Sequence, residues 1–179
     1  MSKVLRSSIL VAALGAALSA QAVNIDIVSK GKFTTGLPVI PLVFVNEKVL
    51  AHSVDDVDAV SPFTTLNYTL SPLTGTGSGL YSNDLGDTLN FSFTVTPIPS
   101  FDLTAGTVSG SGNWTFLGGT GAYSAFTSGS GTMSATFNLA TNHTAMTNFS
   151  GNLQAVPEPA SMAALAVGGL GLLRRRKKA

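Results

Sequence analysis

The residues best suited to chemistry in this sequence are its two histidines. His52 and His143 are the only imidazoles in 179 residues, and a hydrolase triad would need one of them beside an activated serine and a carboxylate. The sequence has no G-x-S-x-G nucleophile elbow, and His143 falls in a segment that we expect to form a turn between strands. We therefore expect no catalytic residue, and we expect the protein not to be an enzyme.

Two short clusters of aspartates are the next candidates, Asp55-Asp56-Val57-Asp58 and Asn83-Asp84-Leu85-Gly86-Asp87. Oxygen-rich loops that contain glycine can hold calcium, but neither cluster has the twelve-residue spacing or the closing glutamate of an EF-hand. We expect solvated turns and no cofactor, and the sequence leaves open whether either cluster binds calcium. The carboxylates in question are Asp55, Asp56 and Asp58 in the first cluster and Asp84 and Asp87 in the second.

Four aromatic side chains offer flat faces on which a sugar ring can stack: Trp114, Tyr68, Tyr81 and Tyr123. Trp114 and Phe116 are two positions apart, so in a strand they share one face, as core residues do. We expect Trp114 to lie in the core. For the tyrosines, core packing and sugar binding both remain open.

The charge of the chain is unevenly distributed. The whole sequence carries +1, but residues 1–22 carry +2, residues 157–179 carry +4 and residues 23–156 carry −5. The central part contains no arginine, which argues against nucleic acid as a partner because phosphate binding needs a dense cationic surface. The chain has no cysteine, so disulfide frameworks, thiolate metal sites and cysteine nucleophiles are excluded.

Residues 23–156 have the composition of a strand-rich domain. Serine and threonine make up 35 of these 134 residues and glycine 15, which favours strands joined by tight turns over long helices. Apolar and polar residues alternate in Thr88–Val95 and Thr132–Leu139, which predicts antiparallel strands with one buried face. We expect long loops at Lys30–Pro38 and Ala51–Val60. Further strands are expected at Val23–Val28, Pro41–Asn46, Phe63–Leu70, Thr107–Leu117, Ala122–Thr127 and Met146–Gln154.

About eight strands with glycine-rich turns between them predict an all-β fold, either a single antiparallel barrel or a sandwich. An N-terminal signal helix and a C-terminal apolar helix are expected to flank it. Gly119-Thr120-Gly121 is expected to be one of the turns, with a strand resuming at Ala122-Tyr123-Ser124. A nucleotide-binding loop is disfavoured there because neither a helix nor a Lys-Ser/Thr pair follows.

The segment Gly112–Tyr123, followed by Thr127–Thr132, resembles the strand–GGTG–aromatic–strand–GSGT repeat of small bacterial secreted barrels related to the allene oxide cyclase and dirigent families. The resemblance covers about residues 110–140 and implies an eight-stranded antiparallel barrel. No motif matches the catalytic or ligand residues of those families, so their chemistry is not implied.

The N-terminus has the three parts of a secretory signal peptide. Lys3 and Arg6 form a positive region, a short apolar run extends from Ile9 to Leu18, and Ala20-Gln21-Ala22 supplies the small residues that signal peptidase requires. We expect cleavage after Ala22. The export machinery and signal peptidase are therefore expected partners.

The C-terminus combines a Pro-Glu-Pro triplet, an apolar run and a basic end. Ala160–Leu173 has 14 residues, short of the roughly 20 that cross a bilayer comfortably, and five basic residues follow it, which would stay cytoplasmic. We expect a short transmembrane helix. The triplet is Pro157, Glu158 and Pro159, and the basic end starts with Arg174, Arg175 and Arg176.

This arrangement over residues 156–178 resembles the PEP-CTERM protein-sorting signal. The resemblance implies handling by an exosortase, a transpeptidase-like membrane enzyme of Gram-negative bacteria that make exopolysaccharide. The triplet matches the recognition sequence and the arginines match the basic stop. These residues would be a substrate signal without catalytic function.

The chain is thus expected to comprise a signal peptide at 1–22, an exported β domain at 23–155 and a sorting signal at 156–179. We expect a secreted or cell-surface protein, transiently anchored by its C-terminus, that is structural or adhesive in the exopolysaccharide layer of a biofilm. Exopolysaccharide and the membrane are the corresponding partners.

Two alternatives remain open. A barrel that binds a small apolar ligand or a glycan would need an internal cavity, lined by residues such as Phe91, Phe93, Met133 and Phe137. A surface enzyme acting on polysaccharide would need two carboxylates that converge in a cleft.

Overall fold

The computed structural model describes residues 21–36, 42–54, 62–95, 100–102, 104–140 and 143–155. Residues 22–155 form one compact unit. The predicted signal helix, the C-terminal apolar helix and the cluster of Asp55, Asp56 and Asp58 lie outside the described residues. Among those that are described, no helix is long and apolar enough to cross a membrane.

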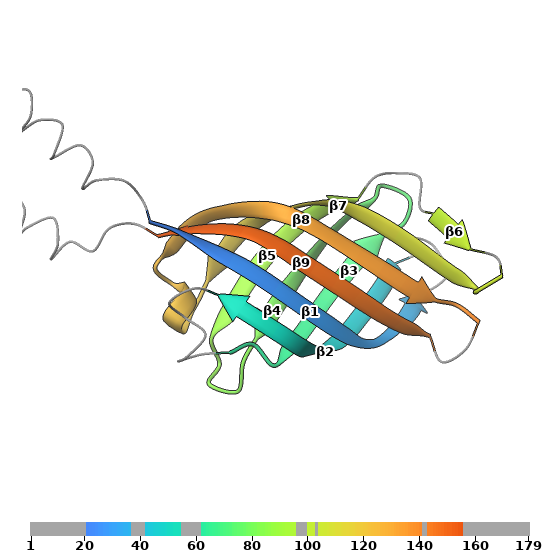
Figure 1. The fold of residues 1–179 in the computed structure, drawn as a ribbon, viewed down its shortest axis with the longest axis horizontal. Coiled ribbons are helices and arrows are strands. Elements are labelled where there is room, and N and C mark those ends of the chain that lie inside the picture. Colours follow the sequence, from blue (N-terminus) through green and yellow to red (C-terminus); the bar gives the residue numbers. More distant parts are fainter. Residues whose placement is uncertain are drawn as a thin grey trace, which may run out of the picture. The chain divides into compact units, whose positions relative to one another are not determined.

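The described chain folds into a closed antiparallel barrel of eight strands (Figure 1). The strands follow the order β5-β4-β3-β2-β1-β9-β8-β7, and pairing of β5 with β7 closes the ring, which confirms the barrel and rules out the sandwich. A short strand, β6, pairs with the start of β7 beyond β5. The elements are β1 (Gln21–Gly36), β2 (Leu42–Val54), β3 (Thr65–Ser71), β4 (Thr76–Ser82), β5 (Thr88–Val95), β6 (Ser100–Asp102), β7 (Thr107–Gly119), the 3-10 turn η1 (Gly121–Tyr123), β8 (Phe126–Asn138) and β9 (Thr144–Ala155).

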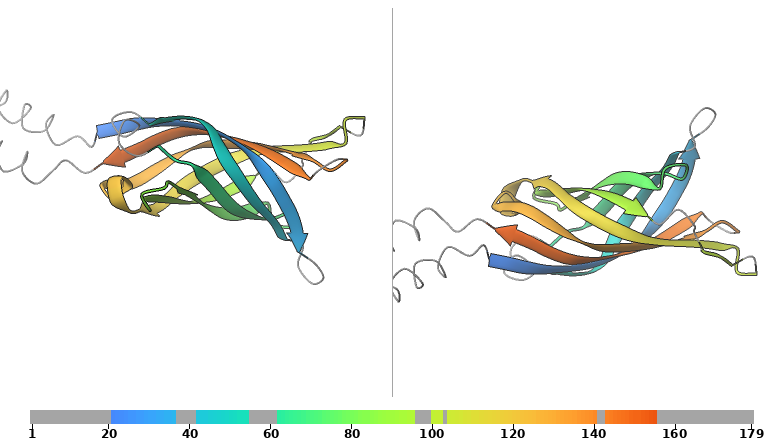
Figure 2. Two further views of the ribbon diagram at one scale, coloured as in Figure 1. Left: turned by 90° about the horizontal axis from the view of Figure 1, so that it is seen from below. Right: turned by 90° about the horizontal axis from the view of Figure 1, so that it is seen from above.

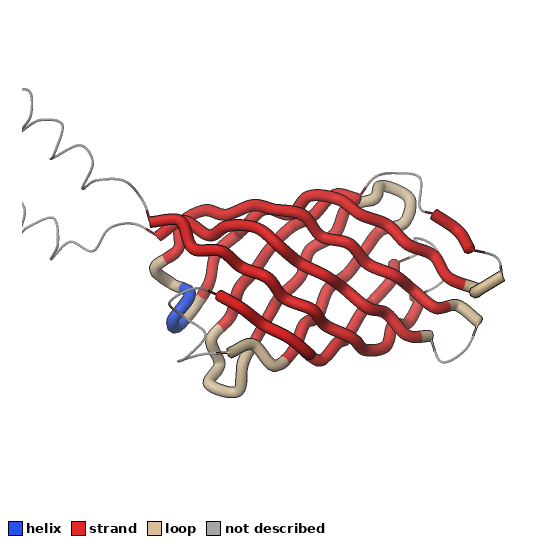
Figure 3. The backbone as a smooth tube through the Cα atoms, in the orientation of Figure 1, coloured by secondary structure: helices blue, strands red, loops and turns tan. Residues whose placement is uncertain are grey.

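Alternation of apolar and polar residues determines which side chains enter the barrel. In β5, Leu89, Phe91 and Phe93 are buried and the residues between them are partly exposed, as the sequence predicts. Met133 and Ala135 of β8 are buried in the same way. The tube drawing in Figure 3 shows the strands crossing the barrel wall obliquely, the tilt that closing a sheet requires.

The two expected long loops are partly strand, so these predictions are wrong in part. β1 continues to Gly36 and β2 to Val54. Within Lys30–Pro38 the exposed Lys30 and Lys32 face outward from a regular strand. In β2 the alternation is interrupted because Leu50 is left out of the register between β1 and β2, a β-bulge that reverses which residues face inward.

Three further elements differ from the prediction. Ala122–Thr127 is not a strand: Gly121–Tyr123 forms the turn η1, and β8 starts at Phe126. Gly121 has φ +59°, and a Cβ there would lie 1.6 Å from the Asp87 carboxylate, so the chain turns tightly against the β4–β5 loop. β4 and β6 were not predicted at all.

Several glycines of the described chain lie inside strands. In β4, Cβ atoms at Gly77 and Gly79 would lie 2.3 and 2.4 Å from the rings of Phe93 and Phe91 on β5. In β8, a Cβ at Gly131 would lie 2.7 Å from the Trp114 indole. Small barrels fill their interior by setting large residues against small ones, and here the aromatic rings occupy the space beside glycines.

The two ends of the barrel differ. At the end where β1 starts and β9 finishes, Tyr123 of η1 stacks on Phe63, with ring centroids 4.3 Å apart, and Phe126 packs beside them. All three side chains are buried, so aromatic packing closes this end. At the other end the β1–β2 strands diverge from β7, β8 and β9 (Figure 2).

Candidate functional sites inside and outside the barrel

The end of the barrel away from η1 contains an apolar cavity of about 200 Å³. It is bounded by the ends of six strands, and its wall is almost entirely aliphatic and aromatic. Phe93, Met133 and Phe137 line it, as the ligand-binding alternative predicts, whereas the predicted Phe91 does not. Further wall residues are Phe33, Val43, Tyr68, Leu70, Val95, Val108 and Ala135.

A chain of buried polar groups begins at the wall of this cavity. The Tyr68 hydroxyl lies 3.1 Å from Thr147 Oγ1, and Thr147 Oγ1 donates a hydrogen bond of 3.0 Å to Glu47 Oε1. Ser29 Oγ donates to the other carboxylate oxygen, Glu47 Oε2. Because the Thr147 hydrogen is used on Glu47, the Tyr68 hydroxyl must donate to Thr147. When Glu47 is ionised, the hydrogen bonds therefore all run toward its carboxylate.

Burial dominates the electrostatics of this cluster. Glu47 is 1% exposed, and burial raises its pKa above the ordinary value, although hydrogen bonds from Ser29 and Thr147 act in the opposite direction. Burial also raises the pKa of Tyr68 and Tyr81, and the negative charge of Glu47 adds to both shifts. The tyrosines therefore stay neutral, and the acid proton of Glu47 is retained to higher pH than in an exposed glutamate.

Sequence reasoning missed Glu47. It is the only glutamate of residues 23–156 and occupies an inward position of β2 between Val45 and Val49. The signal that could have revealed it is a lone glutamate that alternates with valines in the sequence. The predicted strand Pro41–Asn46 ended one residue before it, so the signal went unused.

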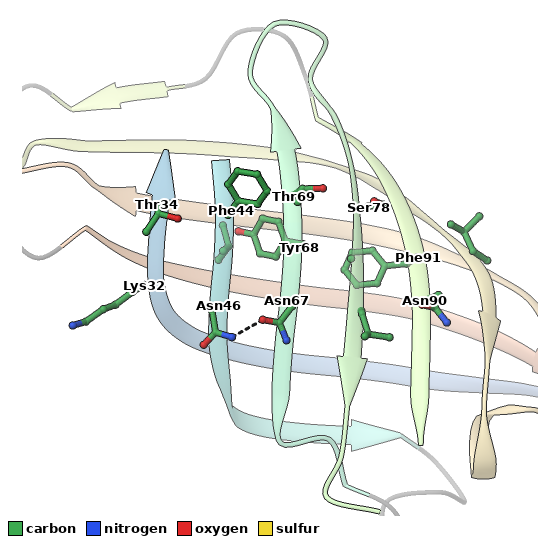
Figure 4. A pocket seen from close by; sticks show the side chains of 14 residues that line it. Lys32, Thr34, Phe44, Asn46, Asn67, Tyr68, Thr69, Ser78, Asn90 and Phe91 are labelled. Atoms are coloured by element: carbon green, nitrogen blue, oxygen red, sulfur yellow. Dashed lines mark hydrogen bonds between the residues drawn. The ribbon is translucent and has the colours of Figure 1, made fainter. Parts of the chain in front are cut away.

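On the outside of the barrel, a shallow groove of about 630 Å³ crosses β1 to β5 and reaches β7 (Figure 4). Its floor contains the positions of Val45, Tyr68, Gly79 and Phe91. Its rims carry Phe44, which is 44% exposed, and Leu117, 63% exposed. Its polar lining consists of Lys32, Thr34, Asn46, Asn67, Thr69, Ser78 and Asn90.

A different surface covers β7, β8 and β9. These three adjacent strands contain no charged residue. Most of their outward positions carry hydroxyls and amides, and Leu117 and Met146 are exposed apolar exceptions. Ser109 Oγ lies 2.9 Å from Thr136 Oγ1, and Ser128 Oγ donates to Gln154 Oε1 at 3.1 Å. Neutral donors and acceptors thus form a ladder across the three strands.

The predicted aromatic candidates belong to the core. Trp114, Tyr81 and Tyr123 are fully buried and Tyr68 is 3% exposed. Trp114 stacks on Phe149, with ring centroids 4.2 Å apart, and its indole Nε1 donates to the Ser150 carbonyl at 2.9 Å. The core prediction for Trp114 is confirmed, and the open question about the tyrosines is settled in favour of the core.

The histidines are not brought together. His52 is half-buried on β2, and its ring packs edge-to-face with that of Phe63, with ring centroids 5.1 Å apart. His143 lies in the predicted turn, directly before β9, with φ +46°. Its carbonyl accepts a hydrogen bond from the Phe33 amide at 2.9 Å, which links the turn to β1. The two residues thus lie toward opposite ends of the barrel.

Asp84 and Asp87 lie in the predicted turn between β4 and β5. Asn83 Oδ1 accepts hydrogen bonds from the Leu85 and Asp87 amides at 3.0 and 2.9 Å, and Asn83 Nδ2 donates to Asp87 Oδ2 at 3.1 Å. The turn is therefore held by an asparagine side chain. No group of three or more potential metal-ligating His, Asp or Glu residues occurs in the described part of the chain.

The predicted processing residues are placed only in part. Ala22 is exposed on β1, while Ala20 lies outside the described residues. The sorting residues also lie outside them, namely Pro157, Glu158, Pro159, Arg174, Arg175 and Arg176.

Fold and cavity together define an eight-stranded antiparallel barrel with one apolar open end. The C-terminus carries a sorting signal: a family model described as the PEP-CTERM protein-sorting motif matches residues 155–177. The motif indicates export through the exosortase pathway, processing by that membrane enzyme and transient membrane anchoring. No curated protein and no solved structure matches the chain.

Proposed function

We propose that this protein works without catalysis in the exopolysaccharide layer at the surface of a Gram-negative bacterium, as a structural or adhesive component. The sorting motif supports delivery to the outside. The barrel would then remain at the cell surface or in the extracellular matrix after processing near Pro157–Pro159.

The observation that carries this proposal is the charge-free outer face of β7, β8 and β9. Hydrated polysaccharide presents hydroxyl groups that both donate and accept hydrogen bonds, as do serine, threonine, asparagine and glutamine side chains. A neutral face can approach such chains without desolvating ions, which is costly. The face thus suits close contact with a glycan matrix.

Two experiments test the proposal in cells. Removal of Pro157–Ala179 should move the protein away from its normal surface or matrix location, and an unchanged location would refute the sorting route. Separately, Thr132→Glu with Ser150→Glu puts two like charges on a registered pair at the centre of the face. The fraction retained in the matrix should fall, whereas Ser53→Glu on β2 should leave it unchanged. Equal retention of all variants would refute a role for the face.

A second candidate function is supported by the internal cavity. The cavity has a volume of about 200 Å³ and apolar walls, and the chain of buried hydrogen bonds begins at Tyr68 in its wall. Such a cavity suits a small apolar ligand with one polar end. This would make the barrel a ligand carrier.

Blocking the cavity tests the second candidate. Gly110 lines the cavity, and a Cβ there would meet no atom within 4 Å. Gly110→Leu should therefore abolish binding of an apolar fluorescent probe, whereas Ser111→Leu, which adds the same side chain on the outer face, should not. Probe binding that survives Gly110→Leu would reject the carrier function.

A further inference from the structure

All three lysines of residues 23–156 lie on one patch of an otherwise acidic domain. Lys30 and Lys32 face outward on β1, and Lys48 faces outward on β2 as the registered neighbour of Lys30. The carboxylate nearest to them in sequence, Glu47, points into the barrel and is buried. The patch is thus locally positive although residues 23–156 carry −5.

This lysine patch adjoins the outer groove, because Lys32 is also one of the groove's lining residues. From Lys32 a row of neighbouring side chains leads across the sheet. Lys32 is registered with Asn46, Asn46 with Asn67, and Asn67 with Leu80, which is followed by Asn90 on β5. Asn46 Nδ2 donates to Asn67 Oδ1 (Figure 4). The row thus starts at a cation and continues through three amides.

A parallel row lies one step closer to the open end. Thr34, Phe44, Thr69 and Ser78 are registered neighbours on β1 to β4, and Figure 4 shows their side chains on the groove side of the sheet. The Phe44 ring is the one aromatic side chain among the groove's exposed lining residues, flanked by hydroxyls on both sides. An apolar ring surface, amides and hydroxyls thus share one concavity.

We infer that this groove binds a segment of an acidic polysaccharide, with the carboxylate of a uronic-acid unit at Lys32. Asn46, Asn67 and Asn90 bind sugar hydroxyls, since each amide offers both donors and an acceptor. The apolar face of one sugar ring lies on Phe44. Charge complementarity selects an acidic chain over a neutral one, and the positive patch places the acid at the β1 side of the groove.

The inference rests on the proposed function and specifies the ligand and the site within it. An anionic lipid surface would be attracted by the same lysines. The groove favours a sugar chain because its polar lining is made of amides and hydroxyls in rows, which match the hydroxyls along a saccharide.

The test uses the full-length chain in detergent micelles and three probes: an oligogalacturonate, the same oligosaccharide with its carboxyl groups reduced, and phosphatidylglycerol vesicles. Calorimetry should show binding of the oligogalacturonate, weaker binding of the reduced chain, and a loss of this difference at high salt as the ammonium charges are screened. Binding to vesicles with no binding to either sugar would overturn the inference in favour of a lipid surface.

Matched variants locate the site. Phe44→Ala should weaken binding of both sugars by about tenfold through loss of the ring contact. Leu85→Ala, which changes an exposed apolar residue in the β4–β5 turn, should have no effect. Lys32→Gln should weaken only the acidic sugar, by about threefold. Asn67→Asp should likewise disfavour the acidic sugar, whereas Asn24→Asp at an exposed position near the start of β1 should not. Fluorescence of the single, buried Trp114 verifies that each variant is folded.

The outcomes separate this inference from the proposed function. If the chain binds the sugars but all groove variants bind as the wild type does, the groove is the wrong site and the function stands. If the reduced sugar binds as tightly as the acidic one, the assignment of an acidic ligand is wrong. If no sugar binds, both the inference and an adhesive role in a glycan layer fail.

Discussion

Thr147 and Glu47 are 100 residues apart in sequence, yet Thr147 Oγ1 donates a 3.0 Å hydrogen bond to Glu47 Oε1 inside the barrel. Their strands, β9 and β2, are not neighbours, because β1 lies between them. The intervening position opposite Glu47 is Gly31, where a Cβ would lie 2.5 Å from the Glu47 Cα. The glycine lets the glutamate side chain reach across β1, so one missing side chain makes a buried carboxylate cluster possible.

The raised pKa of Glu47 predicts a pH-dependent stability. A carboxyl whose pKa is higher in the folded than in the unfolded protein contributes stability that is fully present below the unfolded pKa, 4.5, and is lost as pH rises through the folded pKa. Glu47→Gln should remove this loss and make the protein more stable than wild type at pH 7. Urea unfolding between pH 4 and pH 8 measures both effects.

Two further variants sharpen this prediction. Glu47→Ala leaves the Ser29 and Thr147 hydroxyls without their acceptor and should cost about 2 kcal/mol. Asp26→Asn removes an exposed carboxylate on β1 and should leave the pH dependence intact. A Glu47→Gln protein with the wild-type pH profile would show that Glu47 is not the titrating group.

The sequence predicts the barrel better than the polar cluster, for a physical reason. Phe91 and Phe93 alternate with polar residues, and that local period is sufficient to predict a strand with one buried face. Glu47 and Thr147 meet only because a closed barrel brings β2 and β9 to either side of β1. No local pattern contains that relationship.

The glycines of β4 show the same limit of prediction from local sequence patterns. In β4, Gly77 and Gly79 have the local appearance of a turn, but they are required because rings on β5 occupy the place of their side chains. The composition of a segment alone does not distinguish a glycine that turns the chain from one that makes room for a ring. The outer groove could not be predicted for a similar reason, because its rows of side chains run across several strands.

The buried tyrosines should resist alkaline titration. Burial, together with the negative charge of Glu47, raises the pKa of Tyr68 and Tyr81 above 10.0. The stability that their neutral forms contribute is therefore present below pH 10 and is lost at higher pH. Absorbance at the phenolate band should show that these two groups ionise only when the barrel unfolds. Circular dichroism monitors that unfolding. Ionisation of all three tyrosines near pH 10 in a folded protein would contradict the burial.

The β4–β5 turn should depend on Asn83 more than on its aspartates. Asn83→Ala removes the acceptor for two backbone amides and the donor to Asp87, and we expect a loss of about 1–2 kcal/mol. Asp84→Ala removes only an exposed contact with Thr64 and should cost less than about 0.5 kcal/mol. Thermal unfolding of the two variants checks the order, and a larger effect at Asp84 would show that the carboxylate stabilises the turn.

Gly131 should be the more sensitive of two glycines that lie in neighbouring strands. A Cβ at Gly131 would lie 2.0 Å from the Ser150 carbonyl and 2.7 Å from the Trp114 indole, and the indole must stay in place to donate to that same carbonyl. Gly131→Ala should therefore destabilise the barrel by about 1–3 kcal/mol and shift the Trp114 emission. At Gly110 a Cβ would meet nothing within 4 Å, so Gly110→Ala should change the stability by less than about 0.5 kcal/mol. Urea unfolding followed by far-ultraviolet circular dichroism compares the two without relying on tryptophan, and equal stabilities would mean that Trp114 does not need the space beside Gly131.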